Sequence, residues 1–117
     1  MTELDRRTLE LAECQQLWRH GRVHLEYPQC GWSRTGFRVQ HHDFVITAVF
    51  HVDHPYEPPN VFLSPEPSSR HYYVHGGDSI PRLCWTKSGE WQPRHHLAVA
   101  IATAMRFINE YRTGRVD

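Results

Sequence analysis

The segment SIPRLCWTKSGEWQP, residues 79–93, places one cysteine and two tryptophans in a run rich in proline, glycine and charge. A cysteine that only fills space belongs on an apolar face, and a disulfide needs a partner and an oxidising compartment. Neither use suits Cys84, whose neighbours are those of a loop. Arg82 and Lys87 lie close to it in sequence, and positive charge favours a reactive thiolate. Cys84 is therefore a candidate nucleophile.

The other two cysteines carry no such signal. Cys14, Cys30 and Cys84 are odd in number and form no C-x-x-C pair, so at least one thiol stays free. Cys14 falls at helical spacing with Leu11 and Trp18, which predicts a buried packing residue. Cys30 lies beside a glycine in a turn and indicates no chemistry.

Length and composition set the class of molecule. A chain of 117 residues predicts one domain spanning 1–117. Thirteen Lys and Arg balance thirteen Asp and Glu, so no basic surplus argues for nucleic acid. No apolar run approaches the roughly 20 residues of a membrane span, and the start lacks a signal-peptide pattern. We expect a cytoplasmic protein with no membrane partner.

The elements that must position Cys84 follow from apolar periodicity and turn residues. Val, Ile and aromatic residues alternate in short runs, Pro58 and Pro59 bar a helix, and the polar residues 40–43 fit a hairpin turn. The expected order is a helix over 2–19, strands over 22–27, 36–40, 44–52 and 60–63, an irregular segment over 64–94, and a helix over 96–111. This is an α+β fold with a four-stranded antiparallel meander, a long active-site loop and a C-terminal core helix.

Two motifs flank the loop cysteine. The run DHPYEPPNVFL, residues 53–63, resembles the strand and turn signature of ubiquitin-conjugating enzymes, and a Trp-x-Pro follows the cysteine before a helix, as in that family. The order of elements is similar from the first helix to the helix ending near Tyr111. The matching positions are Asp53, Pro55, Tyr56, Pro58, Pro59, Val61, Leu83, Cys84, Trp91 and Pro93.

The resemblance implies the fold of that family and a transferase activity. Cys84 would take the C-terminal acyl group of a ubiquitin-like modifier from an activating enzyme as a thioester, and would pass it to an amine of a protein substrate. No cofactor is implied. For each proline and aromatic residue of the motifs, a purely structural role in turns and packing stays open.

The chain departs from the family where an oxyanion donor is expected. Most members carry His-Pro-Asn before the cysteine, whereas here His75 stands near the histidine and Gly77 or Asp78 near the asparagine. An imidazole donor, His75 or else His71, with Asp78 orienting it or deprotonating the amine, fits their side-chain chemistry. A structural role for His75 is the alternative. The asparagines of the chain, Asn60 and Asn109, both lie elsewhere in the sequence.

A second departure is the end of the chain soon after the core helix. This resembles compact prokaryotic relatives, which are encoded with an activating enzyme, a ubiquitin-like protein and a deconjugating peptidase, and some of which serve in antiviral defence. Lacking two helices, the core helix would have an open side. We expect a partner or self-association to cover its apolar residues.

Other function classes remain. A non-catalytic variant of the same fold would bind a modifier or scaffold a complex, and an unrelated α+β domain would carry Cys84 as a redox-sensitive thiol. Ten histidines invite a metal site, but the pairs His41–His42, His95–His96 and His71–His75 lack metal-binding spacing, so none is expected. Nucleic-acid stacking is not expected either. The aromatic residues that raised it are Trp32, Tyr72, Tyr73 and Trp85.

Overall fold

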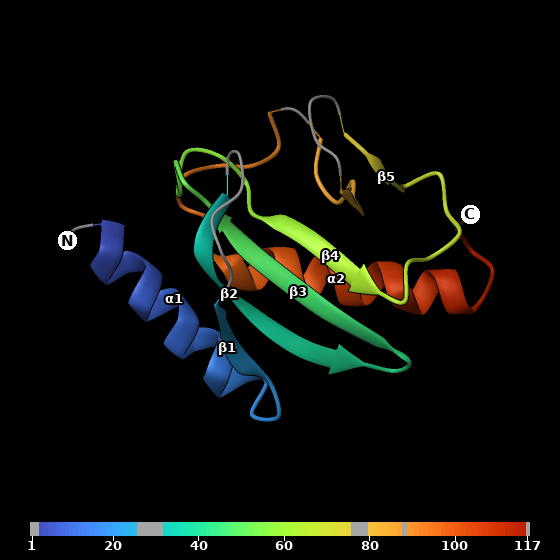
Figure 1. The fold of residues 1–117 in the computed structure, drawn as a ribbon, viewed down its shortest axis with the longest axis horizontal. Helices are drawn as coiled ribbons and strands as arrows, with labels where there is room; N and C mark the ends of the chain where they lie inside the picture. The colour runs from blue at the N-terminus through green and yellow to red at the C-terminus, as the bar shows by residue number, and fades with distance from the viewer. Residues whose placement is uncertain (1–2, 26–31, 76–79, 88, 117) are drawn as a thin grey trace.

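The computed structural model describes residues 3–25, 32–75, 80–87 and 89–116. It is an α+β fold with an N-terminal helix, a four-stranded antiparallel sheet and a C-terminal helix (Figure 1). In chain order the elements are α1 (Glu3–Leu17), β1 (Arg22–Leu25), β2 (Trp32–His41), β3 (Phe44–His51), β4 (Asn60–Ser64), β5 (Tyr72–Val74), β6 (Pro81–Leu83) and α2 (Leu97–Arg112).

The main sheet is the expected meander, with strand order β1-β2-β3-β4 and every neighbouring pair antiparallel. β2 and β3 are joined by a tight turn in which His42 takes a positive φ of 54°. No residue with a side chain fits at position 36 of β2, because its Cβ would overlap the Ala48 carbonyl oxygen of β3. The hairpin predicted over residues 40–43 is confirmed.

The core lies between the sheet and α2. Alternate residues of β2, β3 and β4 point to one face, which α2 covers as Figure 1 shows. The buried residues of α2 are spaced as predicted, and Met105 is half-buried beside them. These buried α2 residues are Leu97, Ala100, Ile101, Ala104 and Ile108. The helix ends before Gly114, whose φ is 75°, also as predicted.

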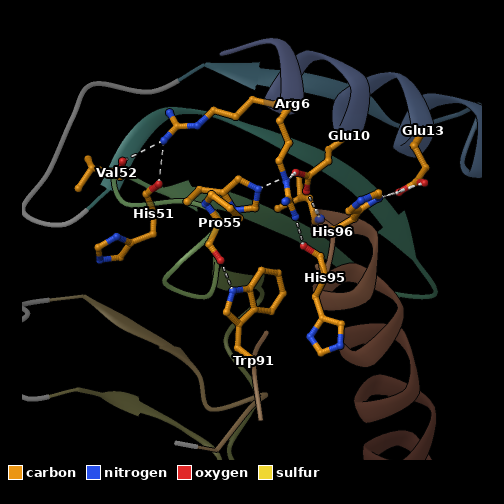
Figure 2. Close-up of polar contacts among 12 residues, drawn as sticks. Arg6, Glu10, Glu13, His51, Val52, Pro55, Trp91, His95 and His96 are labelled. Carbon is orange, nitrogen blue, oxygen red and sulfur yellow. Dashed lines mark hydrogen bonds and ion pairs between the residues drawn. The ribbon is translucent and has the colours of Figure 1, made fainter. Parts of the chain in front are cut away.

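α1 packs its inner face against α2 and the sheet, and Cys14 is fully buried there as predicted. Gly21 follows the helix, and its missing side chain makes room for the Phe37 ring. Arg7 on α1 donates to the carbonyl oxygens of His51 and Val52, 3.1 and 3.0 Å away (Figure 2). The helix stops at Leu17, before the expected end. The predicted cap, Thr2, lies outside the described residues.

The expectation of an irregular segment over 64–94 is wrong in part. β5 and β6 form a two-stranded antiparallel ribbon within it, pairing Tyr72 with Leu83 and Tyr73 with Arg82. Strands of three residues are too short to show a two-residue period in a sequence. Pro81 obscured β6 further, although a proline is tolerated as the first residue of an edge strand.

β1 also differs from expectation. Val23 and Leu25 alternate as core residues would, yet both are exposed. β1 is an outer strand, and α2 packs chiefly against β3 and β4, so the inward face of β1 has little to cover it. Tyr27, the third residue of that pattern, lies outside the described residues. Among the described residues, no helix has the length and apolar character needed to cross a membrane.

Candidate active site

Cys84 comes directly after β6 and is partly buried. Its backbone N–H donates to the His71 carbonyl oxygen at 2.7 Å, which continues the pairing of the ribbon by one residue. The backbone of the cysteine is thereby fixed against β5. Cys84 is held on paired backbone and not on a free loop.

The ribbon places three other side chains on the face that carries the thiol. Because Tyr73 pairs with Arg82, and side chains alternate along a strand, Tyr73, His75, Arg82 and Cys84 occupy one face of it. The rings of Tyr73 and His75 stack with centroids 4.2 Å apart and planes 5° apart. The Nε2 atom of His75 lies 3.3 Å from the Arg82 carbonyl oxygen. The predicted His75 therefore lines the same cavity as Cys84 and is fixed by a ring contact and a backbone contact.

Tyr73 is the partner of the thiol that sequence reasoning missed. Its side chain is diagonal to Cys84 across the ribbon, within reach of an aromatic side chain. The Cys84 side chain, through hydrogen bonding and through charge, raises the pKa of the Tyr73 phenol. Because a phenol O–H is a stronger donor than a thiol S–H, Tyr73 is the donor of the pair.

The opposite face of the ribbon binds it to the main sheet. Leu83 is buried in the core, and the Tyr72 hydroxyl accepts the Leu63 N–H at 3.0 Å and donates to the Leu63 carbonyl oxygen at 3.2 Å. Burial is the main cause of the raised pKa of Tyr72. Through Tyr72 the ribbon is tied to β4, so the thiol has a fixed position relative to the sheet.

Two tryptophans join the cysteine segment to residues 53–59. The indole N–H of Trp85 donates to the Pro59 carbonyl oxygen at 2.9 Å. The indole N–H of Trp91 donates to the Pro55 carbonyl oxygen at 2.7 Å (Figure 2). The two indoles meet edge to face, with centroids 5.8 Å apart. The two motifs noted in the sequence are therefore in direct contact.

Cys84 lines a cavity of about 110 Å³. Its walls come from both motifs and from the ribbon: Pro58, Pro59, Asn60, His75, Arg82, Leu83, Cys84, Trp85 and Thr86. A second hollow of about 330 Å³ shares Pro58 and Thr86 with it and is lined also by Tyr56 and Lys87. Tyr56 is 69% exposed, so a role for it in packing is wrong. Cys84 thus lines the smaller of two adjoining hollows.

Asn60 is a wall residue of this cavity that sequence reasoning set aside. It lies at the start of β4, and its side chain is 93% buried. Within the described part of the chain its Nδ2 atom has no hydrogen-bond partner. A buried amide without a partner is costly. The sequence could not place Asn60 near the thiol, because the two are brought together only by contact between β4 and β6.

The remaining predicted residues divide four ways. Arg82 lines the cavity, Lys87 lines the adjoining hollow, and the His71 ring lies against Phe107 of α2, with centroids 6.2 Å apart. Asp78 lies outside the described residues, as do Gly77 and Cys30. Of the histidine candidates, His75 is the one that reaches the cavity.

A buried polar network around Glu10 lies next to the 53–59 segment and holds it in place (Figure 2). The Glu10 carboxylate accepts hydrogen bonds from His54 Nε2 at 2.6 Å, Arg6 Nε at 2.9 Å and the Leu97 N–H at 2.6 Å. Burial alone would raise the pKa of Glu10, but the bonds from His54, Arg6 and Leu97 outweigh it and hold the pKa below 4.5. The network ties α1, the 53–59 segment and the start of α2 together.

Glu10 and His54 also escaped sequence reasoning, although a signal existed. Glu10 precedes the buried Cys14 by four residues and so shares its helix face, where a charge needs a partner. The partner, His54, lies inside the 53–63 motif itself. Its burial against Trp91, with ring centroids 6.1 Å apart, links the network to the cysteine segment.

The described residues contain no group of three or more His, Cys, Asp or Glu side chains placed to hold a metal ion. Two of the paired histidines have other partners. His41 lies 2.8 Å from the Asn109 side-chain oxygen, and His96 lies 3.2 Å from a Glu13 carboxylate oxygen.

Comparison of the chain with protein-family models, curated proteins and solved structures gives no match. Family membership and activity are accordingly proposals that rest on the residues and the geometry.

Proposed function

We propose that this protein is a ubiquitin-like-protein conjugating enzyme with Cys84 as its nucleophile. The observation that carries the proposal is the contact between the two motifs: residues 53–63 and residues 83–93 meet through the Trp85 and Trp91 hydrogen bonds, and both line the cavity that holds the thiol. In an unrelated α+β domain there would be no reason for these two motifs to contact each other around the cysteine.

The order of elements supports the same family. A helix, a four-stranded antiparallel meander, a segment bearing the cysteine and a core helix follow one another as the ubiquitin-conjugating fold requires. The partners would be an activating enzyme, a ubiquitin-like modifier and a protein substrate. The proposed setting is a compact prokaryotic pathway in the cytoplasm, with antiviral defence as one role that such pathways serve.

The chemistry is two acyl transfers. In the first, the Cys84 sulfur attacks the carbonyl carbon of the thioester carried by the activating enzyme; the carbonyl electron pair moves to oxygen, returns, and expels the enzyme's sulfur as thiolate. In the second, an amine attacks the new thioester, an amide forms, and Cys84 leaves with the proton that nitrogen gives up. Each step passes through a tetrahedral oxyanion, which a positioned donor stabilises.

The cavity residues have roles that fit these steps. Arg82 supplies positive charge beside the sulfur, and His75 orders the ribbon face on which the thiol lies. Asp78 remains the proposed base or orienting carboxylate. The open hollow next to the cavity, lined by Tyr56 and Lys87, offers space for the extended C-terminus of a modifier.

The test is charging of the protein by its activating enzyme with ATP and the modifier, followed by a non-reducing gel. We expect an adduct that is lost with thiol reductant and absent from Cys84→Ala, while Cys84→Ser traps a more stable oxyester. Cys14→Ala is the matched control, because the buried Cys14 thiol should not charge. If the activating enzyme charges itself but no adduct reaches the wild type, the protein is a modifier-binding module instead.

A further inference from the structure

The hydroxyl of Tyr73 is placed where the proposed reaction needs a donor. The ribbon register sets Tyr73 diagonal to Cys84 on one face, and stacking on His75 fixes the plane of its ring. Its side chain is 44% exposed, so an incoming acyl group can approach it. A donor held in place before the reaction is more effective than one that must be ordered during it.

We propose that the Tyr73 hydroxyl is the hydrogen-bond donor to the reacting atoms of Cys84, first to the sulfur and then to the thioester carbonyl oxygen. This rests on the proposed acyl-transfer function. The carbonyl oxygen is joined to the sulfur through a single carbon, so a donor that reaches the sulfur reaches the oxygen by a small rotation.

The steps balance without any proton leaving Tyr73. When Cys84 ionises, its proton goes to water and the phenol keeps its own, donating to the sulfur. When the acyl carbon bonds to that sulfur, the sulfur no longer carries charge and the hydroxyl turns to the carbonyl oxygen. When an amine attacks, the oxyanion accepts this hydrogen bond until it collapses to the amide and releases Cys84.

Two neighbouring groups fit this role less well. The Nε2 atom of His75 faces the Arg82 carbonyl oxygen at 3.3 Å. The Nδ2 atom of Asn60 is buried within the wall of the cavity, where an acyl oxygen does not reach it unless the side chain moves. Tyr73 has both the diagonal position next to Cys84 and the exposure.

The experiment uses a small acyl donor, S-phenyl thioacetate, so that it needs neither the activating enzyme nor the modifier. The protein is acetylated at Cys84, the reagent is removed, and loss of the acetyl group to free lysine is followed by mass spectrometry of the Cys84 peptide. Tyr73→Phe keeps the ring and its stacking with His75, so a change reports the hydroxyl alone. We expect both acetylation and aminolysis to slow by about tenfold.

Tyr111→Phe is the matched control, since it removes a phenol hydroxyl that contacts the Ser68 N–H and lines neither hollow, and we expect wild-type rates from it. Rates for Tyr73→Phe within twofold of wild type would overturn the inference, as would a wild-type Cys84 that is not acetylated at all. The charging assay with the modifier judges the proposed function separately, because it can fail while the small-thioester result stands.

Discussion

Cys84 and Cys14 show how one side-chain type takes opposite characters within a single fold. Burial, with a smaller effect from the charges of Glu13 and Glu10, raises the pKa of the Cys14 thiol to about 12. That thiol is a core residue. Cys84 instead has a phenol, an imidazole and a guanidinium beside it and an open cavity in front. The sequence distinguished the two, because helical spacing marked one and loop neighbours marked the other.

Glu10 is a charged residue that is buried in the core, where its partners determine the stability of the fold. We predict that Glu10→Gln lowers the free energy of unfolding by about 3 kcal/mol or more, because it leaves Arg6 and the buried His54 without their carboxylate. The measurement is urea denaturation at pH 7. Glu13→Gln is the control: its pair with His96 is exposed on both sides and should cost less than about 1 kcal/mol. Equal losses from the two variants would contradict the prediction.

At the scale of elements, the ribbon of β5 and β6 is the part that sequence reasoning could not supply. Long, regular features were legible: the hairpin, β3, and the buried stripe of α2 all follow from periodicity over eight residues or more. The ribbon has three residues a strand, and its register is fixed by tertiary contact with Leu63. Since Tyr73 reaches Cys84 only through that register, its role was hidden as well.

The attachment of the ribbon to the sheet gives a prediction at this scale. Tyr72→Phe removes the hydroxyl that both accepts from and donates to the Leu63 backbone, leaving buried polar groups without partners. We expect a loss of about 1–3 kcal/mol in unfolding free energy by chemical denaturation. Hydrogen exchange at the Leu63 amide should rise in parallel.

Tyr111→Phe is a fair comparison, because that hydroxyl accepts an exposed N–H, from Ser68 at 3.1 Å. We expect it to change stability by less than about 0.5 kcal/mol. A Tyr72→Phe variant as stable as Tyr111→Phe would mean that the ribbon is held by Leu83 alone.

At the scale of the whole molecule, Glu10 makes stability depend on acid. Its pKa lies below the ordinary 4.5, so its contribution is fully present above about pH 4.5 and is lost as the pH falls through the lowered value. Protonated Glu10 resembles glutamine. We predict that the stability difference between wild type and Glu10→Gln shrinks below pH 4.5, measured by urea denaturation at each pH. A difference unchanged down to pH 3 would refute this.

Part of the candidate site could also be predicted from the sequence. Cys84, His75 and the flanking motifs were found because they are local patterns, and the structure brings them to one cavity. Asn60 and Tyr73 were missed because their nearness to the thiol depends on how β4, β5 and β6 are arranged. We expected exposed apolar residues on the core helix, but they occur on other elements as well. On α2 the exposed large hydrophobic residue among those described is Val99, and on α1 Leu9 and Leu17 are exposed.

Both tryptophan anchors of the cysteine segment end on main-chain oxygens, those of Pro59 and Pro55. A main-chain oxygen is present whatever residue occupies the position, whereas an indole N–H is supplied by tryptophan alone. Mutational tolerance at this contact is therefore one-sided. Variants of residues 55 and 59 that preserve the backbone path keep the segment docked, but no change on the acceptor side can compensate for the loss of Trp85 or Trp91.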